Sequence, residues 1–124
     1  MLNRGKKSLA LDLKDPKTRD RLEPLIREAD VVIEQFRPGV MSRLGLGYDD
    51  MCRIKPDIVY CAITGYGQTG PKRDRAGHDL NYVAHAERQE PGMGDPQRPV
   101  VPPALIADIA GGCLLYTSPS PRDS

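Results

Sequence analysis

The order of apolar segments in the first half of the chain constrains its fold more than any other feature. Residues 8–13 alternate leucines with small or polar residues, which is the period of a half-buried strand. Helical spacing follows over residues 16–29, a β-branched run over 30–34, a second helical stretch over 48–55 and another β-rich run over 58–63. Strands that alternate with helices in this way form right-handed βαβ units. The sequence therefore predicts an α/β fold with an open, mainly parallel sheet.

The helix expected over residues 16–29 has a clear start signal and one discordant residue. Asp15 is a good N-cap, and Pro16 suits the first helical position because its missing N–H has no partner there. Pro24 removes a backbone hydrogen bond further along, so we expect it to kink or shorten the helix. The continuous apolar run over 30–34 is typical of a parallel strand that is covered on both faces.

Two loops follow the predicted strands and lie where an open α/β sheet binds its ligands. They are residues 35–38 and 64–70, beyond the carboxyl ends of the strands. The second loop has the spacing G-x-G-x-x-G of a dinucleotide-binding turn, but Pro71 follows it directly and no suitably placed acidic residue comes after a second strand. We interpret it as bare backbone that lets a bulky cofactor approach, with a flexible turn of positive-φ glycines as the alternative.

Composition argues against several classes of partner. The formal net charge is +1, from 18 Lys and Arg against 17 Asp and Glu, so no overall field attracts nucleic acid or an anionic membrane. No apolar run is long enough to span a bilayer and no secretory signal pattern is present, so we expect a cytoplasmic protein. Cys52, Cys61 and Cys113 have neither disulfide nor zinc-ligand spacing, which predicts no metal site.

Two residues in the second half can carry acid–base chemistry. His78 lies in a dense polar group, and its imidazole is the natural proton shuttle near neutral pH, although a loop or capping role is the alternative. His85, among small apolar residues, is interpreted as structural or exposed. Asp108 is a carboxylate in an otherwise apolar segment. It is either a helix cap or a reactive group in a dry pocket, where loss of solvent makes it a stronger base or nucleophile.

Five segments together carry a family pattern. They are Asn3–Lys14 (NRGKKSLALDLK), Phe36–Met41 (FRPGVM) with Arg43–Gly47 (RLGLG), Thr64–Pro71 (TGYGQTGP), Gly77–Tyr82 (GHDLNY) and Ala107–Gly112 (ADIAGG). In this order they resemble the family III CoA-transferases and α-methylacyl-CoA racemases, the CaiB/BaiF family. The resemblance covers residues 2–112 and is far more specific than any single motif.

The resemblance implies a fold and a molecular setting. Family members have a large domain with a Rossmann-like open α/β sheet, a smaller second domain, and protomers that interlock as a homodimer. Residues 1–112 are then part of the large domain, incomplete at both ends. Residues 113–124 resemble a translated transposon-type sequencing adapter, so we expect a non-native tail, with a natural disordered Ser/Pro tail as the alternative.

The resemblance also implies site residues for an acyl-CoA substrate, with coenzyme A as part of that substrate and no tightly bound cofactor. His78 and Asp108 match the catalytic His and Asp of the racemases. The positions expected near the nucleotide end are Leu11, Asp12, Leu13, Lys14 and Arg43. Those expected around the thioester are Gly77, Asp79, Leu80, Asn81 and Tyr82. Four positively charged side chains are either phosphate contacts or part of a solvated surface. They are Arg4, Lys6, Lys7 and Arg43.

Two reactions are known in the family. In racemases the matching His and Asp exchange the α-proton of a 2-methylacyl-CoA through an enolate. In transferases the matching Asp attacks the thioester, forms a mixed anhydride and passes CoA to another carboxylic acid. The segment around His78 looks like the racemase version, so the sequence favours racemase-like proton transfer. The third hypothesis is an inactive, poorly folding gene fragment, because the opening strand and second domain of the family are missing.

Overall fold

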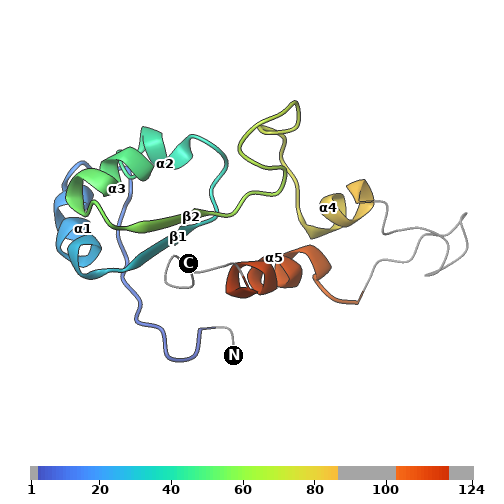
Figure 1. Ribbon diagram of the computed structural model, residues 1–124, viewed down its shortest axis with the longest axis horizontal. Coiled ribbons are helices and arrows are strands. Elements are labelled where there is room, and N and C mark those ends of the chain that lie inside the picture. The colour runs from blue at the N-terminus through green and yellow to red at the C-terminus, as the bar shows by residue number, and fades with distance from the viewer. Residues whose placement is uncertain (1–2, 87–102, 118–124) are drawn as a thin grey trace, which may run out of the picture. The chain divides into compact units, whose positions relative to one another are not determined.

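The computed structural model describes residues 3–86 and 103–117. The chain forms two compact units, residues 1–62 and residues 63–124. The first unit contains α1 (Lys17–Glu28), β1 (Val31–Glu34), α2 (Val40–Arg43), α3 (Tyr48–Ile54) and β2 (Val59–Ala62). The second contains α4 (Asp79–His85) and α5 (Ile106–Thr117), labelled in Figure 1.

The sheet of the first unit is parallel, as predicted. β1 and β2 pair in register from Val31 with Val59 to Glu34 with Ala62. The chain between them passes through α2 and α3, which is the crossover of a βαβ unit (Figure 1). The α/β fold class and the strand, helix, strand order expected over residues 30–63 are therefore confirmed, with the short helix α2 as an additional element.

The strand expected over residues 8–13 is absent. Residues 8–12 have no regular secondary structure, Leu13 begins a turn, and the segment has no ladder partner in the part of the chain that the structure describes. Leu9 is 58% exposed. Alternation of leucines favours an extended backbone, but a strand also needs a neighbouring edge to accept and donate its hydrogen bonds. In this unit β1 and β2 pair only with each other.

The core of the first unit gathers on one face of the two strands. Its buried members are Ile26, Leu46, Met51 and Ile58. Val32 and Tyr60 pack against this cluster, whereas Val31, Ile33 and Val59 on the other face are 49%, 55% and 40% exposed. The prediction of a strand covered on both faces is therefore wrong within this unit, because the buried residues of α1 and α3 both pack on the Val32 side.

The start of α1 follows the predicted capping chemistry. The Asp15 carboxylate accepts a hydrogen bond from the Lys17 N–H at 3.0 Å, and the Asp15 carbonyl accepts one from the Thr18 N–H at 2.9 Å. The helix continues through Pro24 to Glu28, so the early end expected at this proline does not occur. One missing N–H is tolerated because the face that carries Thr18 is anchored in the unit.

The fold raises the pKa of the Tyr60 hydroxyl. Burial, together with the negative charge of Glu34 and a hydrogen bond to it, raises the pKa of Tyr60 from 10.0 to about 12. We expect an alkaline absorbance titration to show a tyrosine ionisation near pH 12, and Tyr60→Phe to remove that step.

The sign of the accompanying stability change follows from this raised value. The stabilisation is complete below the unfolded pKa of 10.0 and is lost as pH rises through about 12, because only the unfolded tyrosine releases its proton in between. Urea unfolding midpoints should therefore fall less over this pH range in Tyr60→Phe than in the parent chain. An equal fall in both proteins would contradict the assignment.

The described residues of the second unit form a glycine-rich loop and the helices α4 and α5. α5 runs from Ile106 to Thr117 and thus passes through Gly112, where we expected the native sequence to end. The boundary at residue 113 stays a prediction, since a helix can continue through any sequence of adequate propensity.

Candidate acyl-CoA site

Three of the residues expected at the nucleotide end of CoA line one pocket of the first unit. This pocket has a volume of about 480 Å³ and lies between the start of α1 and the end of α2. Its lining residues are Leu13, Lys14, Asp15, Pro16, Thr18, Arg19, Arg43, Leu44, Gly45 and Leu46. Leu11 and Asp12 are outside this lining, so the structure brings together only Leu13, Lys14 and Arg43 of the predicted set.

Asp12 is not in the pocket lining, but its hydrogen bonds hold the segment that is. Its carboxylate accepts a hydrogen bond from the Lys14 N–H at 2.9 Å, and its carbonyl accepts one from the Thr18 hydroxyl. Thr18 is only 3% exposed, so this second bond ties the segment before α1 to the buried face of the helix. The hydrogen bonds of Asp12 therefore hold the loop that presents Lys14, which is a structural task.

The pocket carries more positive charge than the sequence led us to expect. Lys14 and Arg43 are joined by Arg19, which was not among the predicted site residues. Three cations around one depression suit a phosphate-bearing ligand, and Asp15 is the one lining carboxylate. The spacing of Lys14 and Arg19 around a helix start is the signal that could have identified Arg19. Arg4, Lys6 and Lys7 are exposed and lie outside the lining.

The thioester segment of the second unit is organised around the ring of Tyr82. Tyr82 donates its hydroxyl hydrogen to the Gly77 carbonyl at 2.8 Å, and its ring meets that of Tyr66 edge-on with centroids 5.0 Å apart. Gly65 and Gly77 both lie so close to this ring that a Cβ on either would collide with it. Gly77 and Tyr82 therefore hold the glycine-rich loop against α4.

The glycine-rich loop does not form a dinucleotide-binding turn. Gly67 and Gly70 have φ angles of 85° and 89°, which glycine adopts without strain. No helix begins directly after Gly70, since α4 starts at Asp79. The loop thus lacks the helix N-terminus that would receive a pyrophosphate.

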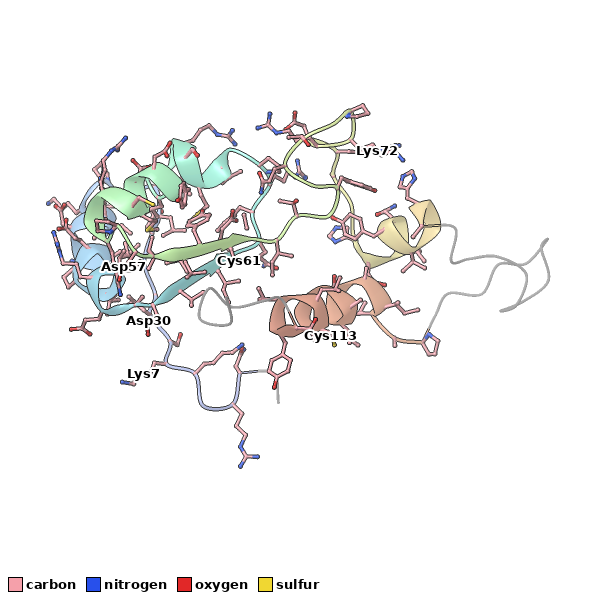
Figure 2. The ribbon with its side chains drawn as sticks, viewed as in Figure 1. Lys7, Asp30, Asp57, Cys61, Lys72 and Cys113 are labelled. Atoms are coloured by element: carbon pink, nitrogen blue, oxygen red, sulfur yellow. The ribbon has the colours of Figure 1, made fainter. Side chains whose placement is uncertain are left out.

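His85 lies beside this loop. Its Nδ1 is 3.2 Å from Lys72 Nζ, and its ring meets Tyr66 edge-on with centroids 5.6 Å apart. Figure 2 shows Lys72 extending from the loop on the same side as this part of α4. These contacts link α4 to the loop.

His78 is the N-cap residue of α4. Its N–H donates to the Asn81 side-chain oxygen at 2.9 Å, and its carbonyl accepts from the Asn81 N–H at 2.8 Å. These bonds fix the backbone and leave the imidazole exposed. Leu80, in the first turn, is 41% exposed. The sequence left open whether His78 caps or reacts, and the geometry allows both, because these bonds use only the backbone atoms of His78.

Asp108 lies in the first turn of α5, where it is exposed rather than held in a dry pocket. The Asp79 carboxylate accepts hydrogen bonds from the N–H groups of Ala107 at 2.6 Å and Asp108 at 3.0 Å. Asp79 directly follows His78, so these bonds bring the two predicted catalytic segments together. An imidazole and a carboxylate are both groups that can exchange a proton with a bound substrate.

The described residues contain neither a metal-binding cluster nor a candidate membrane-spanning helix. Within residues 3–86 and 103–117, no group of three or more His, Cys, Asp or Glu side chains could hold a metal ion. Cys52, Cys61 and Cys113 are free thiols. No helix in the described parts of the chain is both long and apolar enough to cross a membrane.

Known proteins resemble this chain over nearly its whole length. The family model described as CoA-transferase family III matches residues 1–118. Human succinyl-CoA:glutarate CoA-transferase is 44% identical over 118 residues, which cover 93% of this chain and 26% of that protein. Human alpha-methylacyl-CoA racemase is 41% identical over 114 residues, which cover 92% of this chain and 30% of that protein.

A solved structure shares the fold. It is that of a hypothetical protein from Mycobacterium tuberculosis, with a TM-score of 0.82 and 41% identity over 90% of this chain and 32% of that chain. The chain spans only 26% and 30% of the two human relatives. With a family model matched from residue 1 to residue 118, the chain belongs to CoA-transferase family III.

Proposed function

We propose that this chain supplies the acyl-CoA site of an α-methylacyl-CoA racemase-like enzyme, with His78 and Asp108 as its proton-transfer pair. The observation that carries the proposal is the pair of hydrogen bonds accepted by Asp79, which join the His78 segment to the first turn of α5. Racemisation at a carbon next to a thioester needs two groups that can each give and take a proton. His78 and Asp108 have that chemistry, and both side chains are exposed to an incoming substrate.

In the proposed reaction, one of the two residues removes the α-proton of the CoA thioester. The electron pair passes to the thioester oxygen and forms an enolate, which backbone N–H groups would stabilise. The other residue then returns a proton to the opposite face of the same carbon. Each acid or base typically contributes about 10²- to 10⁴-fold to the rate.

The nucleotide end of CoA fits the pocket of the first unit. Lys14, Arg19 and Arg43 can pair with phosphate groups, while Leu13 and Leu44 add apolar surface to the same pocket. CoA enters and leaves as part of the substrate in this proposal, so the pocket need not retain it.

CoA transfer is the second candidate function. The human relative that is 44% identical is named succinyl-CoA:glutarate CoA-transferase, which favours this reaction. Here Asp108 would attack the thioester carbonyl, release CoA as its thiolate and form a mixed anhydride. The thiolate would then attack the Asp108 carbonyl and release the donor acid, which leaves CoA as a thioester on Asp108. The acceptor carboxylate would displace CoA from that thioester and form a second anhydride. Attack of the thiolate on the acceptor carbonyl would give the product thioester and free Asp108. Asp108 takes part in both reactions, as an acid or base in the first and as the nucleophile in the second, whereas His78 is required only for proton exchange.

Isotope exchange separates these candidates. The test protein is this chain with the remainder of the family fold restored, incubated with a (2R)-2-methylacyl-CoA in heavy water. We expect deuterium at C2 without any added acid, because proton return from solvent-exchanged groups labels that carbon. CoA transfer to an added carboxylate with no exchange at C2 would contradict the racemase proposal and support the second candidate.

The 124-residue chain can also be tested by itself for folding and for CoA binding. Cooperative urea unfolding of the 124-residue chain together with CoA binding would count against the inactive-fragment hypothesis. The interlocked homodimer and the cytoplasmic location stay predictions from resemblance and composition. Light scattering of the restored protein tests the first of them.

A further inference from the structure

The first turn of α5 is capped from a distant part of the second unit. The Leu105 carbonyl accepts the first intrahelical hydrogen bond, from the Ile109 N–H at 3.1 Å, so Leu105 occupies the N-cap position. Its side chain has no oxygen, and it cannot accept the N–H groups of Ala107 and Asp108. Asp79 accepts both, at 2.6 and 3.0 Å, and so takes the place of a local Ser or Asp cap.

The arrangement is favourable for reasons that do not depend on substrate. An ionised carboxylate makes stronger hydrogen bonds to N–H groups than a neutral acceptor does. It also lies at the positive end of the α5 dipole. Asp79 is only partly exposed, which limits competition from water for these two bonds.

The backbone of Asp79 is also held in place, at the start of α4. Asp79 is the first residue of α4, directly after His78, whose N–H and carbonyl both bond to Asn81. His78 is therefore one peptide bond from Asp79, and Asp108 is one hydrogen bond from it. Asp79 and Asp108 are 29 residues apart in the sequence, and the Asp79 carboxylate joins them by a hydrogen bond.

We propose that Asp79 is a positioning residue, which sets the place of Asp108 relative to His78 by capping α5 from α4. This inference rests on the proposed function of His78 and Asp108, and it differs from the contact with CoA that the family resemblance implied for Asp79. A substrate contact would act on binding. A positioning residue acts on the rate of the bound complex, because a small displacement of a reacting group is costly.

The test compares three variants of the restored protein in the isotope-exchange assay. Asp79→Ala removes the acceptor, and we expect kcat to fall by roughly 10- to 100-fold while KM for the acyl-CoA stays within about twofold. Asp79→Asn keeps one side-chain oxygen in place, so kcat should stay within several-fold of the parent. Asp79→Ala combined with Leu105→Ser gives α5 a local cap but no tie to α4, and its kcat should stay low.

Amide hydrogen exchange supplies the structural measurement. The Ala107 and Asp108 amides should lose protection in Asp79→Ala and regain it when Leu105→Ser is added. A rise in KM at unchanged kcat would make Asp79 a substrate contact and overturn the inference. Recovery of kcat with Leu105→Ser would do the same, since helix stability alone would then explain the loss.

The failure of the proposed function can be told apart from the failure of this inference. If the parent protein neither labels C2 nor transfers CoA, the proposed function fails, and with it the catalytic part of the inference. The cap itself is still judged by the two amides, because their protection does not require turnover. Unchanged protection in Asp79→Ala would overturn the cap even in an active enzyme.

Discussion

Replacing Asp108 by asparagine should lower α-proton exchange by about 10²- to 10⁴-fold, the usual contribution of a general acid or base. Asparagine has nearly the same shape but cannot take up a proton or form an anhydride, so both candidate reactions should be lost. The exposed position of Asp108 in the first turn of α5 keeps the structural cost small, within about 0.5 kcal/mol. Isotope exchange and CoA transfer measured on the same preparation check this result.

A matched control exists in the same unit. Asp74 is an exposed loop carboxylate whose ion pair with Arg73 is long, at 3.8 Å, so Asp74→Asn should leave both activities unchanged. His78→Asn completes the set, because asparagine is also a good N-cap and should preserve the start of α4. It should abolish proton exchange while sparing any CoA transfer. Full exchange activity in Asp108→Asn would exclude Asp108 from the chemistry.

Substitution of Gly65 by alanine should be the most damaging change to the second unit. The added Cβ would overlap Cε1, Cζ and Oη of Tyr82, so the ring must leave its place between the glycine-rich loop and α4. Overpacking of this kind costs about 1–3 kcal/mol, and loss of the Tyr82 hydrogen bond to Gly77 adds about 1 kcal/mol. Because the chain has five tyrosines and no tryptophan, tyrosine fluorescence can follow its urea unfolding.

Two further variants show whether the ring is the cause. Gly111 in α5 has open space where a Cβ would be, so Gly111→Ala should be neutral or stabilise the helix by up to about 1 kcal/mol. In a Tyr82→Ala background, the Gly65→Ala change should cost little more, since the colliding atoms are gone. An equal cost with and without the Tyr82 ring would show that Gly65 matters for its backbone and not for this contact.

The elements that could be predicted from sequence are those with a local physical cause. The βαβ order follows from the period of apolar residues, and the start of α1 follows from the capping ability of Asp15. The prediction of a strand over residues 8–13 was wrong, because a strand needs a neighbouring strand to pair with and no local sequence pattern specifies that neighbour. The expected double covering of β1 failed for the same kind of reason, since it depends on which other segments pack against the strand.

The candidate site also has one part that could be predicted from sequence and one that depends on the tertiary structure. The residues by themselves offered His78 and Asp108 as groups with acid–base chemistry, and the family resemblance assigned them, with residues 11–14, to an acyl-CoA substrate. The tertiary structure decided that Lys14 and Arg43 share a pocket with Arg19, and that Asp79 spans from α4 to α5. A carboxylate in the first turn of a helix can cap its own helix, another helix or a ligand, and all three have the same local sequence. Only the packing of α5 against α4 in the folded unit brings the second helix within hydrogen-bonding distance of it.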